Sequence, residues 1–529
     1  MTRPALLVLV LAAGAAFAHG EPAALALVGG TVVDVSDLGR SPRDLPDTVV
    51  LVRGDRIAAV GRRGEVAVPR DARVIDVAGS WVVPGLVDGF AGMNSQAQAN
   101  AYLYMGVTSI VGVGGTRRGA LLTAARPGPH VYPLKTVGVR LDATGNLALL
   151  SREESLRELD ELRRDGVKVL LLLYPLPPER TAEIARAARE RGLATIGELG
   201  ATSYAEAARV GVQAFVHTSR YSLPLAREGM RAAVAAAPFG PPKLEFYRFL
   251  VGLDPDAPGV AEHAGLLGRS RVGLIPTLSL EYLDLPGHRN PWKEPVAAIL
   301  DPEGIHLPAD PATGERPVPP EAGADAFPEG LAATLLALEA RYARAGARHL
   351  AGSGTSAFGT MPGISLHTEL ELLVRIGLTP RQALAAATAN FEAVFGWTGV
   401  GQVKPGYRAD LVVVGKSPVA DVAHLREIEH VVLSGERIDR ERLLARRGSS
   451  LARPTARPRP SPRRRRRGRG RPGDGRSGLV GAEGGPPRRP AGGGGPRVVV
   501  DNGCLRLTEV PTRLDAGCPP ASLHRGSTP

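Results

Sequence analysis

The sequence predicts an α/β protein built on a closed (β/α)8 barrel, and two observations carry this prediction. First, between residues 87 and 392 apolar segments alternate with segments of helical periodicity, as where GVKVLLLLY precedes TAEIARAARERG, and GVTSIVGVG precedes a predicted helical stretch. Apolar strands alternating with amphipathic helices indicate a parallel sheet that is buried on both faces. Second, six or more such units within roughly 300 residues fit a closed barrel better than an open sheet.

Both flanks of the barrel region predict small β units instead. Residues 26–86 contain runs such as ALVGGTVVDV, and residues 393–447 contain GYRADLVVVG and HVVLSGERI. Valine and isoleucine alternating with polar residues, with glycine and aspartate between the runs, are typical of short strands joined by tight turns. Within the barrel region, residues 284–328 are rich in proline and aspartate, and we expect them to form a long loop over its top.

Residues 1–18 predict a secretory signal peptide. They contain one arginine, an apolar run of about a dozen residues and the sequence Ala16-Phe17-Ala18, which matches an A-x-A cleavage site. The alternative is a membrane anchor, but the apolar run is short for a membrane span. We therefore expect an exported protein, periplasmic or secreted, with no membrane span in its mature form.

The C-terminal segment, residues 448–529, predicts a disordered tail of arginine, proline and glycine. Residues 451–529 contain 17 arginines, no lysine and five acidic residues, so this segment accounts for the whole formal net charge of +12. An arginine run can bind polyanions through phosphate contacts, which is one alternative function, but the composition also fits an unselected extension and we expect no specific nucleic-acid partner. Both cysteines, Cys504 and Cys518, lie in the tail, so the body has no thiol for a disulfide, a cysteine-ligated zinc or a nucleophile.

Eight short motifs between residues 26 and 447 point to a known family. In chain order they are GDRIAAVG, VIDVAGSWVVPGLVD, GVTSIVGVGG, GVKV, GVQAFVH, IPTL, LHTELELLVRIGLTPRQALAAAT and PGYRADLVVV. Through them the chain resembles the amidohydrolase superfamily, specifically its imidazolonepropionase-like and Xaa-Pro dipeptidase-like branch. The resemblance implies a (β/α)8 TIM barrel with a small β-sandwich domain formed from both ends of the body. It also implies metal-dependent hydrolysis of C–N bonds in amides, cyclic amides or dipeptides.

The same resemblance places the metal ligands, and most of them are missing here. Related enzymes use two histidines after the first strand, a carboxylated lysine, two further histidines, and an aspartate after the last strand. These six positions fall, in order, on Phe90, Gly92, Lys168, Glu198, His217 and Gly354. The lysine and one histidine are retained, glutamate is a different potential ligand, and the other three positions offer no side-chain donor. Gly354 also removes the group that takes the proton from the attacking water, so no catalytic residue can be assigned.

Three functional hypotheses follow. The first is a degenerate amidohydrolase, a pseudoenzyme candidate, with no tightly bound cofactor and a small-molecule ligand at the barrel mouth. In it, Lys168 and Glu198 form an ion pair, and His217 either binds or serves as a structural hydrogen-bonding residue. The second is an active hydrolase with one divalent metal (Zn, Mn or Fe) on Lys168, His217 and, less favourably, Glu198. The third is polyanion binding through the tail. The sequence names no substrate and fixes no oligomeric state.

Overall fold

The structure is a computed structural model that describes residues 24–114, 119–141, 147–316, 327–445, 497–501 and 504–508. The chain divides into two units, and the first comprises Met1–Ala445 and Val499–Arg506. The second unit, Arg446–Val498 and Leu507–Pro529, lies almost wholly outside the described residues. The predicted signal peptide and most of the predicted tail also lie outside them. Among the residues that are described, we find no helix with the length and apolar character needed to cross a bilayer.

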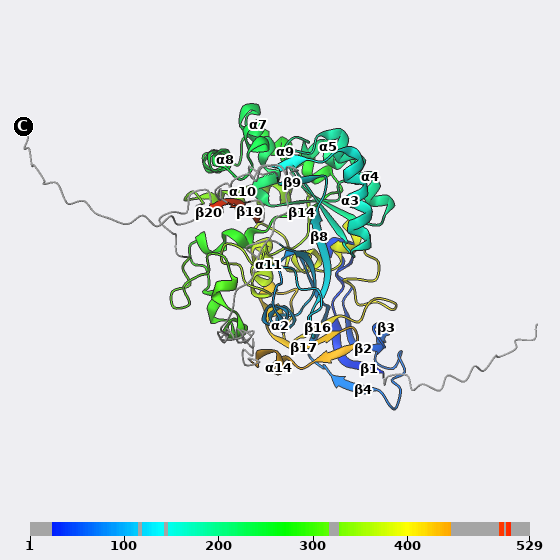
Figure 1. Ribbon diagram of the computed structural model, residues 1–529. Helices are drawn as coiled ribbons and strands as arrows, with labels where there is room; N and C mark the ends of the chain where they lie inside the picture. Colours follow the sequence, from blue (N-terminus) through cyan, green and yellow to red (C-terminus); the bar gives the residue numbers. More distant parts are fainter. Residues whose placement is uncertain are drawn as a thin grey trace, which may run out of the picture. The chain divides into compact units, whose positions relative to one another are not determined.

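Eight parallel strands form a curled sheet in the order β6-β7-β8-β11-β12-β13-β14-β15 (Figure 1). Their bounds are β6 Leu86–Ala91, β7 Val107–Val113, β8 His130–Thr136, β11 Val169–Tyr174, β12 Ala194–Leu199, β13 Ala214–Val216, β14 Gly273–Ile275 and β15 Arg348–His349. The chain after β15 returns to β6, because the Gly89 N–H donates to the Ala351 carbonyl and the Gly354 N–H to the Phe90 carbonyl, both at 2.8 Å. These bonds join the two edges of the sheet, and the predicted (β/α)8 barrel is confirmed.

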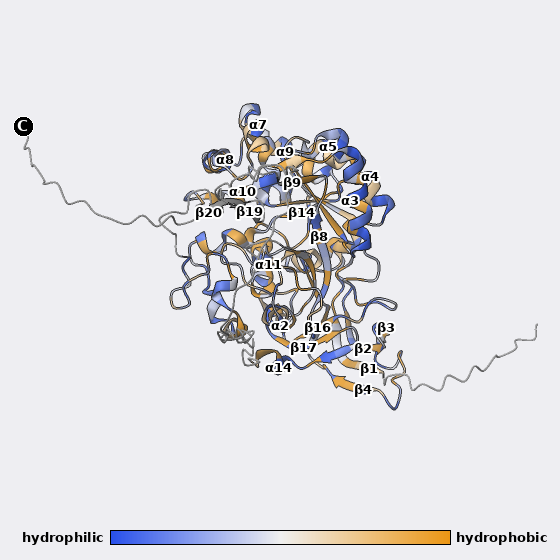
Figure 2. Ribbon diagram, viewed as in Figure 1, coloured by the Kyte–Doolittle hydropathy of each residue, from blue (hydrophilic) through white to orange (hydrophobic). Residues whose placement is uncertain are grey.

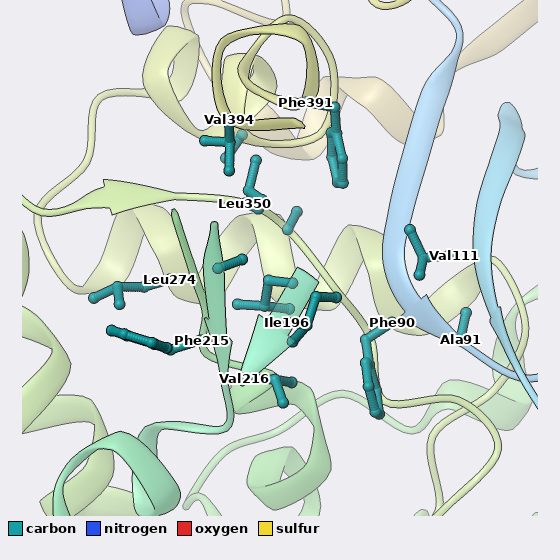
Figure 3. Close-up of a cluster of buried hydrophobic side chains, with 14 of the residues drawn as sticks. Phe90, Ala91, Val111, Ile196, Phe215, Val216, Leu274, Leu350, Phe391 and Val394 are labelled. Carbon is teal, nitrogen blue, oxygen red and sulfur yellow. The ribbon is translucent and has the colours of Figure 1, made fainter. Parts of the chain in front are cut away.

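The barrel strands are apolar because both of their faces are covered. Every residue of β6, β7, β11 and β12 is buried. Figure 3 shows Ile196, Val216 and Leu274, from three neighbouring strands, in one cluster of buried side chains. Burial of an apolar side chain of this size contributes about 1.5 to 3 kcal/mol to folding, so apolar packing is a main source of stability for the barrel wall.

Helices cover the outside of the barrel. Their bounds are α2 Gln96–Tyr104, α3 Arg152–Arg164, α4 Pro178–Glu190, α5 Tyr204–Val210, α6 Thr218–Tyr221, α7 Glu228–Ala236, α8 Pro241–Val251, α9 Pro258–Arg269, α10 Leu331–Arg344, α11 Ile364–Arg375, α12 Pro380–Ala386 and α13 Asn390–Phe395. Figure 2 shows hydrophilic residues along α3 and α4. Ser151 and Ser203 begin α3 and α5 with capping boxes, which satisfy backbone N–H groups at the helix starts.

Three segments between the barrel strands are not helical. The described residues 119–129, which follow β7, contain Pro127 and Gly128 and form no helix, so the helical stretch predicted after GVTSIVGVG is wrong there. A hairpin of β9 (Val139–Leu141) and β10 (Leu147–Leu149) precedes α3. In the predicted long loop, the described residues 284–316 contain only short 3-10 turns: η3 Pro291–Lys293, η4 Pro295–Ile299 and η5 Pro302–Gly304.

Both ends of the body build one β-rich domain, a mixed sheet in the order β18-β17-β16-β5-β1-β2-β3, with β4 paired to β1. The strands are β1 Leu25–Val32, β2 Leu45–Arg53, β3 Arg56–Arg62, β4 Arg73–Asp76, β5 Trp81–Pro84, β16 Leu411–Val414, β17 Ile428–Leu433 and β18 Glu436–Ile438. Two short helices accompany them, α1 Ser36–Gly39 and α14 Arg440–Leu444. Antiparallel pairing of β5 with β16, for example Val82 with Val413, joins segments that lie more than 300 residues apart.

Two further strands fall within the segment predicted to be disordered. β19 (Arg497–Asp501) and β20 (Cys504–Thr508) form a two-stranded sheet. The prediction of disorder is therefore wrong for these ten residues. The valines at 498–500 favour a strand because β-branched side chains pack well on a pleated surface.

Candidate active site

A pocket opens at the carboxyl ends of the barrel strands, where the family's chemistry would take place. It has about 490 Å³ of space, including the part open to solvent at its entrance. The lining residues come from the chain after β13, from α8, from the chain after β14, from α10 and its approach, and from the chain after β15. They are His217, Thr218, Ser219, Arg220, Lys243, Tyr247, Pro276, Thr277, Leu280, Glu281, Phe327, Leu335, Ala357 and Phe358.

Phe90 occupies the first predicted ligand position with a buried aromatic ring. It lies near the end of β6 and is 2% exposed. Its ring meets the imidazole of His217 edge to face, with 5.1 Å between the ring centroids. Figure 3 shows Phe90 among the apolar side chains of the barrel interior. An aromatic ring therefore packs against the one family histidine that this chain retains.

His217 directly follows β13, so it lies at the mouth, as expected. Its backbone N–H donates to the Ile275 carbonyl at 2.9 Å, which fixes it beside β14. Its Nδ1 lies 2.7 Å from the Thr277 hydroxyl, so the ring shares a hydrogen bond with that side chain. The backbone of His217 has a φ of 66°, a left-handed conformation that is uncommon outside glycine. Such positions cluster at functional sites.

Gly354 lies where the family carries its aspartate, and the structure shows why a side chain cannot return there simply. Its φ is +68°, and a Cβ built on it would come within 2.6 Å of Leu280 Cδ2 and 2.7 Å of Leu280 Cγ. Real Cβ atoms essentially never approach a neighbour closer than 3.0 Å. Leu280, from the 3-10 helix η2 (Leu278–Asp284), thus fills the place of the missing carboxylate.

Glu198 does lie at the mouth, but its partner is an arginine. Arg220 Nε is 3.1 Å from Glu198 Oε1, and the two side chains are 5% and 3% exposed. The Tyr174 hydroxyl donates to the same oxygen at 2.9 Å. Burial raises the pKa of Tyr174 well above its ordinary value, so this hydroxyl keeps its proton. The Arg220 guanidinium also lies over two rings, 5.5 Å from the centroid of Tyr174 and 5.9 Å from that of Tyr247.

Lys168 does not reach the mouth, so its predicted pairing with Glu198 is wrong. β11 runs from Val169 to Tyr174, which places Lys168 just before the strand at the amino end of the barrel, where it is exposed. Glu198 is in register with Leu173 near the carboxyl end. With about 3.3 Å of rise per residue, the two side chains start roughly 16 Å apart along the strand direction. The motif GVKV does belong to the fourth barrel strand, β11. Lys168 lies at the amino end of that strand, however, and the prediction placed it at the carboxyl end.

Three buried carboxyl groups lie close to the pocket. Asp88 accepts hydrogen bonds from the Ser353 N–H at 2.8 Å and the Ser353 hydroxyl at 2.5 Å. Glu369 accepts one from the Ser279 N–H at 2.7 Å, and burial, reinforced by the negative charge of Asp88, raises the pKa of Glu369 to about 8. Burial also raises the pKa of Glu281 well above its ordinary value. Desolvation thus favours the protonated form of both glutamates.

The residues present do not fit the metal centre that the family implies. Among the described residues, no group of three or more histidine, cysteine, aspartate or glutamate side chains is arranged to hold a metal ion. The second histidine position is Gly92, whose N–H donates to the Thr355 carbonyl and which has no side-chain donor. Glu198 is committed to a cation, and Lys168 is at the opposite end of the barrel. A closed or open zinc site needs at least three protein ligands.

The sequence analysis missed Arg220, Lys243 and Tyr247. Arg220 could have been found, because it follows the strand of AFVHTSRY by four residues and therefore belongs to the same end of the barrel as His217. Lys243 and Tyr247 lie on α8, and nothing in the local sequence connects that helix with the mouth. The Lys243 Nζ is 5.5 Å from the centroid of the Tyr247 ring.

Comparison with known proteins gives consistent matches. The model of the amidohydrolase family matches residues 325–438. Imidazolonepropionase from Anaeromyxobacter dehalogenans (strain 2CP-1 / ATCC BAA-258) is 26% identical over 453 residues, which covers 78% of this chain and 95% of that protein. Adenine deaminase from Rubrobacter xylanophilus is 35% identical over 131 residues, but this covers only 22% of this chain and 21% of that protein.

Solved structures show the same fold. A proposed prolidase from Bifidobacterium longum has a TM-score of 0.53 at 20% identity, with 80% of this chain and 99% of that chain covered. A Xaa-Pro dipeptidase has a TM-score of 0.51 at 14% identity, with 79% and 100% covered. At these identities the likeness concerns the fold, and the chemistry has to be argued from the side chains.

Proposed function

The chain belongs to the amidohydrolase superfamily, in its imidazolonepropionase-like and Xaa-Pro dipeptidase-like branch, and from this premise we propose that it is a degenerate member. The family hydrolyses C–N bonds with bound metal. In our proposal this protein has lost metal-dependent hydrolysis and keeps the barrel mouth as a binding pocket for a small molecule. Fold alone supports many chemistries, so the proposal rests on the site.

The observation that carries the proposal is that the places of the missing ligands are filled. Phe90 packs its ring against His217, and Leu280 lies 2.6 Å from where a Cβ at position 354 would stand. Glu198, a further potential donor, is bound to Arg220. A site that had lost its metal by a single recent substitution would keep a cavity lined by the other donors. Here apolar groups and an ion pair take up that space.

The pocket that remains suits a compact ligand with an apolar part. Phe327 and Phe358 lie 4.9 Å apart by ring centroids, and Tyr247 lies 5.9 Å from Phe327, so three rings line one side. His217 and Thr277 supply hydrogen-bonding groups on another side. Ligand pockets commonly combine apolar walls with a few such polar groups.

Metal content and hydrolysis test the proposal together. The full chain is expressed with zinc, manganese or iron supplied, dialysed, and analysed for bound metal, then assayed with Xaa-Pro dipeptides. We expect well under one equivalent of metal per chain and no hydrolysis above background. Stoichiometric metal that is lost in His217→Ala but kept in the control His424→Ala, a histidine of the β-rich domain, would reject degeneracy. It would establish the alternative, an active hydrolase with a remodelled single-metal site.

Two further parts of the proposal concern residues outside the described ranges. We propose export to the periplasm or medium, which the sequence of residues 1–18 supports. Detection of the mature chain in a periplasmic or secreted fraction, with its amino terminus after Ala18, tests this. We also propose that the arginine-rich tail has no specific nucleic-acid partner; a sequence-dependent affinity in a DNA or RNA binding assay contradicts it.

A further inference from the structure

A second cavity opens at the amino end of the barrel, away from the mouth. It lies where β15 begins, between the turn from α10 to β15, the turn from α11 to α12, and the short helix α1. It has about 730 Å³ of space, including the part open to solvent. The lining residues are Leu38, Arg40, Ala343, Arg344, Gly346, Ala347, Arg348, His349, Ile376, Gly377, Leu378, Gln382 and Asn390.

The charges around this cavity are all of one sign. Three arginines line it, and among the described residues no aspartate or glutamate does. Arg40 pairs with Asp37 at 2.7 Å, in an exposed ion pair. Arg348 is half-buried and Arg344 is exposed, and neither has an ion-pair or side-chain hydrogen-bond partner in the part of the chain that the structure describes. Two arginines without a described carboxylate partner therefore line the same partly enclosed space.

The position of Arg344 alone has an ordinary explanation, but the pair does not. Arg344 ends α10, and a cation in the last turn of a helix complements the partial negative charge there. Arg341, in the same turn, has its own carboxylate partner in Asp256. Arg348 lies on β15, outside any helix, so the helix dipole gives no reason for a second arginine at the same cavity. Half-burial of the Arg348 side chain without a carboxylate partner costs solvation free energy, which a bound anion would offset.

Part of the remaining wall is apolar and firmly held, beside the polar residues His349, Gln382 and Asn390. Leu38, Ala347, Ile376 and Leu378 provide aliphatic surface. The wall from α1 is fixed against α12, because a Cβ at Gly39 would come within 2.7 Å of the Gln382 Cα. The cavity thus combines two cationic groups with preformed aliphatic walls, the features of a site for an anion attached to a compact apolar body.

We infer that this cavity binds a small organic oxyanion, a phosphate monoester or a carboxylate with a compact apolar group, through Arg344 and Arg348. The inference is independent of what the barrel mouth does. Guanidinium groups recognise both oxyanions by paired N–H donors, so the two chemistries share one site.

Calorimetric titration with phenyl phosphate and with benzoate tests the inference on the full-length chain. Arg344→Ala/Arg348→Ala is compared with a matched control, Arg163→Ala/Arg164→Ala, which removes two exposed arginines from the last turn of α3. The arginine-rich tail is present in all three proteins and contributes equally. We expect saturable binding of at least one probe by the wild type and the control, with at least a tenfold loss of affinity in Arg344→Ala/Arg348→Ala.

Each other outcome decides against the inference. Equal affinity in all three proteins shows that the probe binds elsewhere. Equal weakening in both double variants shows that binding depends on the net charge of the protein and not on this cavity. The absence of saturable binding to both probes also overturns it. If Arg344→Ala/Arg348→Ala does not fold by circular dichroism, Arg344→Gln and Arg348→Gln are titrated singly with the same criterion. Tighter binding of phenyl phosphate than of benzoate assigns the site to phosphate monoesters, and the reverse to carboxylates.

Discussion

The ion pair between Glu198 and Arg220 offers the sharpest test of how the mouth is built. In a metal-binding relative a donor at position 198 would serve the metal, whereas here its carboxylate meets a guanidinium at 3.1 Å with both side chains almost fully buried. We therefore consider Glu198→Gln, Arg220→Met and the double variant. Glutamine keeps the shape of the glutamate and its ability to accept from the Tyr174 hydroxyl, so the change isolates the charge.

The expected magnitude follows from burial. Removing one partner of a buried ion pair leaves the other charge uncompensated and costs about 3 to 5 kcal/mol. The double variant leaves no charge behind, and we expect it to lose only about 1 to 2 kcal/mol, because apolar replacement of a buried pair is often close to neutral. The coupling energy between the two positions is then at least about 4 kcal/mol in magnitude.

Equilibrium unfolding in urea is the suitable assay. With an unfolding entropy of about 2.1 cal/mol/K per residue, a body of this size shifts its melting temperature by only about 1 °C per kcal/mol, so thermal scans resolve the cycle poorly. A control cycle uses Arg191 and Asp160, which are 2.7 Å apart but 23% and 56% exposed, and whose coupling we expect to be much smaller.

Additive losses would refute the reasoning. If the stability lost by the double variant equals the sum of the two single losses, the two charges do not stabilise each other. The ion pair is then not what compensates the buried charge of Glu198. If either single variant instead loses bound metal or hydrolytic activity, with no recovery in the double, position 198 serves a metal site after all.

Three further predictions follow from other parts of the structure. Gly354→Asp should destabilise the chain by several kcal/mol without creating activity, since the new Cβ overlaps Leu280, and Leu280→Ala in the same chain should recover part of the loss in urea unfolding. Glu369→Gln should gain stability relative to the wild type as the pH rises from about 5 to 8. The pKa of Glu369 is about 8 in the native state and near 4.5 in the unfolded chain, so over this range the native carboxyl holds a proton that the unfolded chain has released, and the wild type loses stability. A stability difference between the two proteins that stays constant with pH in urea unfolding would contradict this. Ending the chain after residue 447 should change the stability of the body by less than about 1 kcal/mol, and a larger loss in urea unfolding would show that β19 and β20, which this removes, contribute to it.

The fold could be predicted from the sequence because its signal repeats. Several barrel strands carry a similar apolar run, so an error in one strand–helix unit does not change the interpretation of the others. The exceptions are local: residues 119–129 lack the predicted helix, and the valines at 498–500 form a strand within a segment whose composition predicts disorder. Composition averages over many residues, so it cannot resolve a strand of five.

The site could be predicted only where a residue's place in its strand was readable. Glu198 and His217 were placed correctly at the mouth, because β12 ends one residue after Glu198 and β13 ends directly before His217. Lys168 was placed wrongly, because the family resemblance assigned it to a metal-ligand position at the mouth, whereas its strand starts at Val169 and continues to Tyr174. This error also made the predicted partner of Glu198 wrong. Because Lys168 lies at the far end of the barrel, Arg220 pairs with the carboxylate instead.

The identity of that cation agrees with the proposed loss of the metal. A buried carboxylate cannot persist without a positive charge or a proton, so a mouth without a metal requires the chain to supply one or the other. At Glu198 it supplies Arg220, whose guanidinium lies over the rings of Tyr174 and Tyr247. At Glu369 it supplies no cation in the described contacts, and the pKa rises to about 8 instead. Both solutions remove free negative charge from the mouth, and a divalent cation finds its strongest attraction where such charge is free.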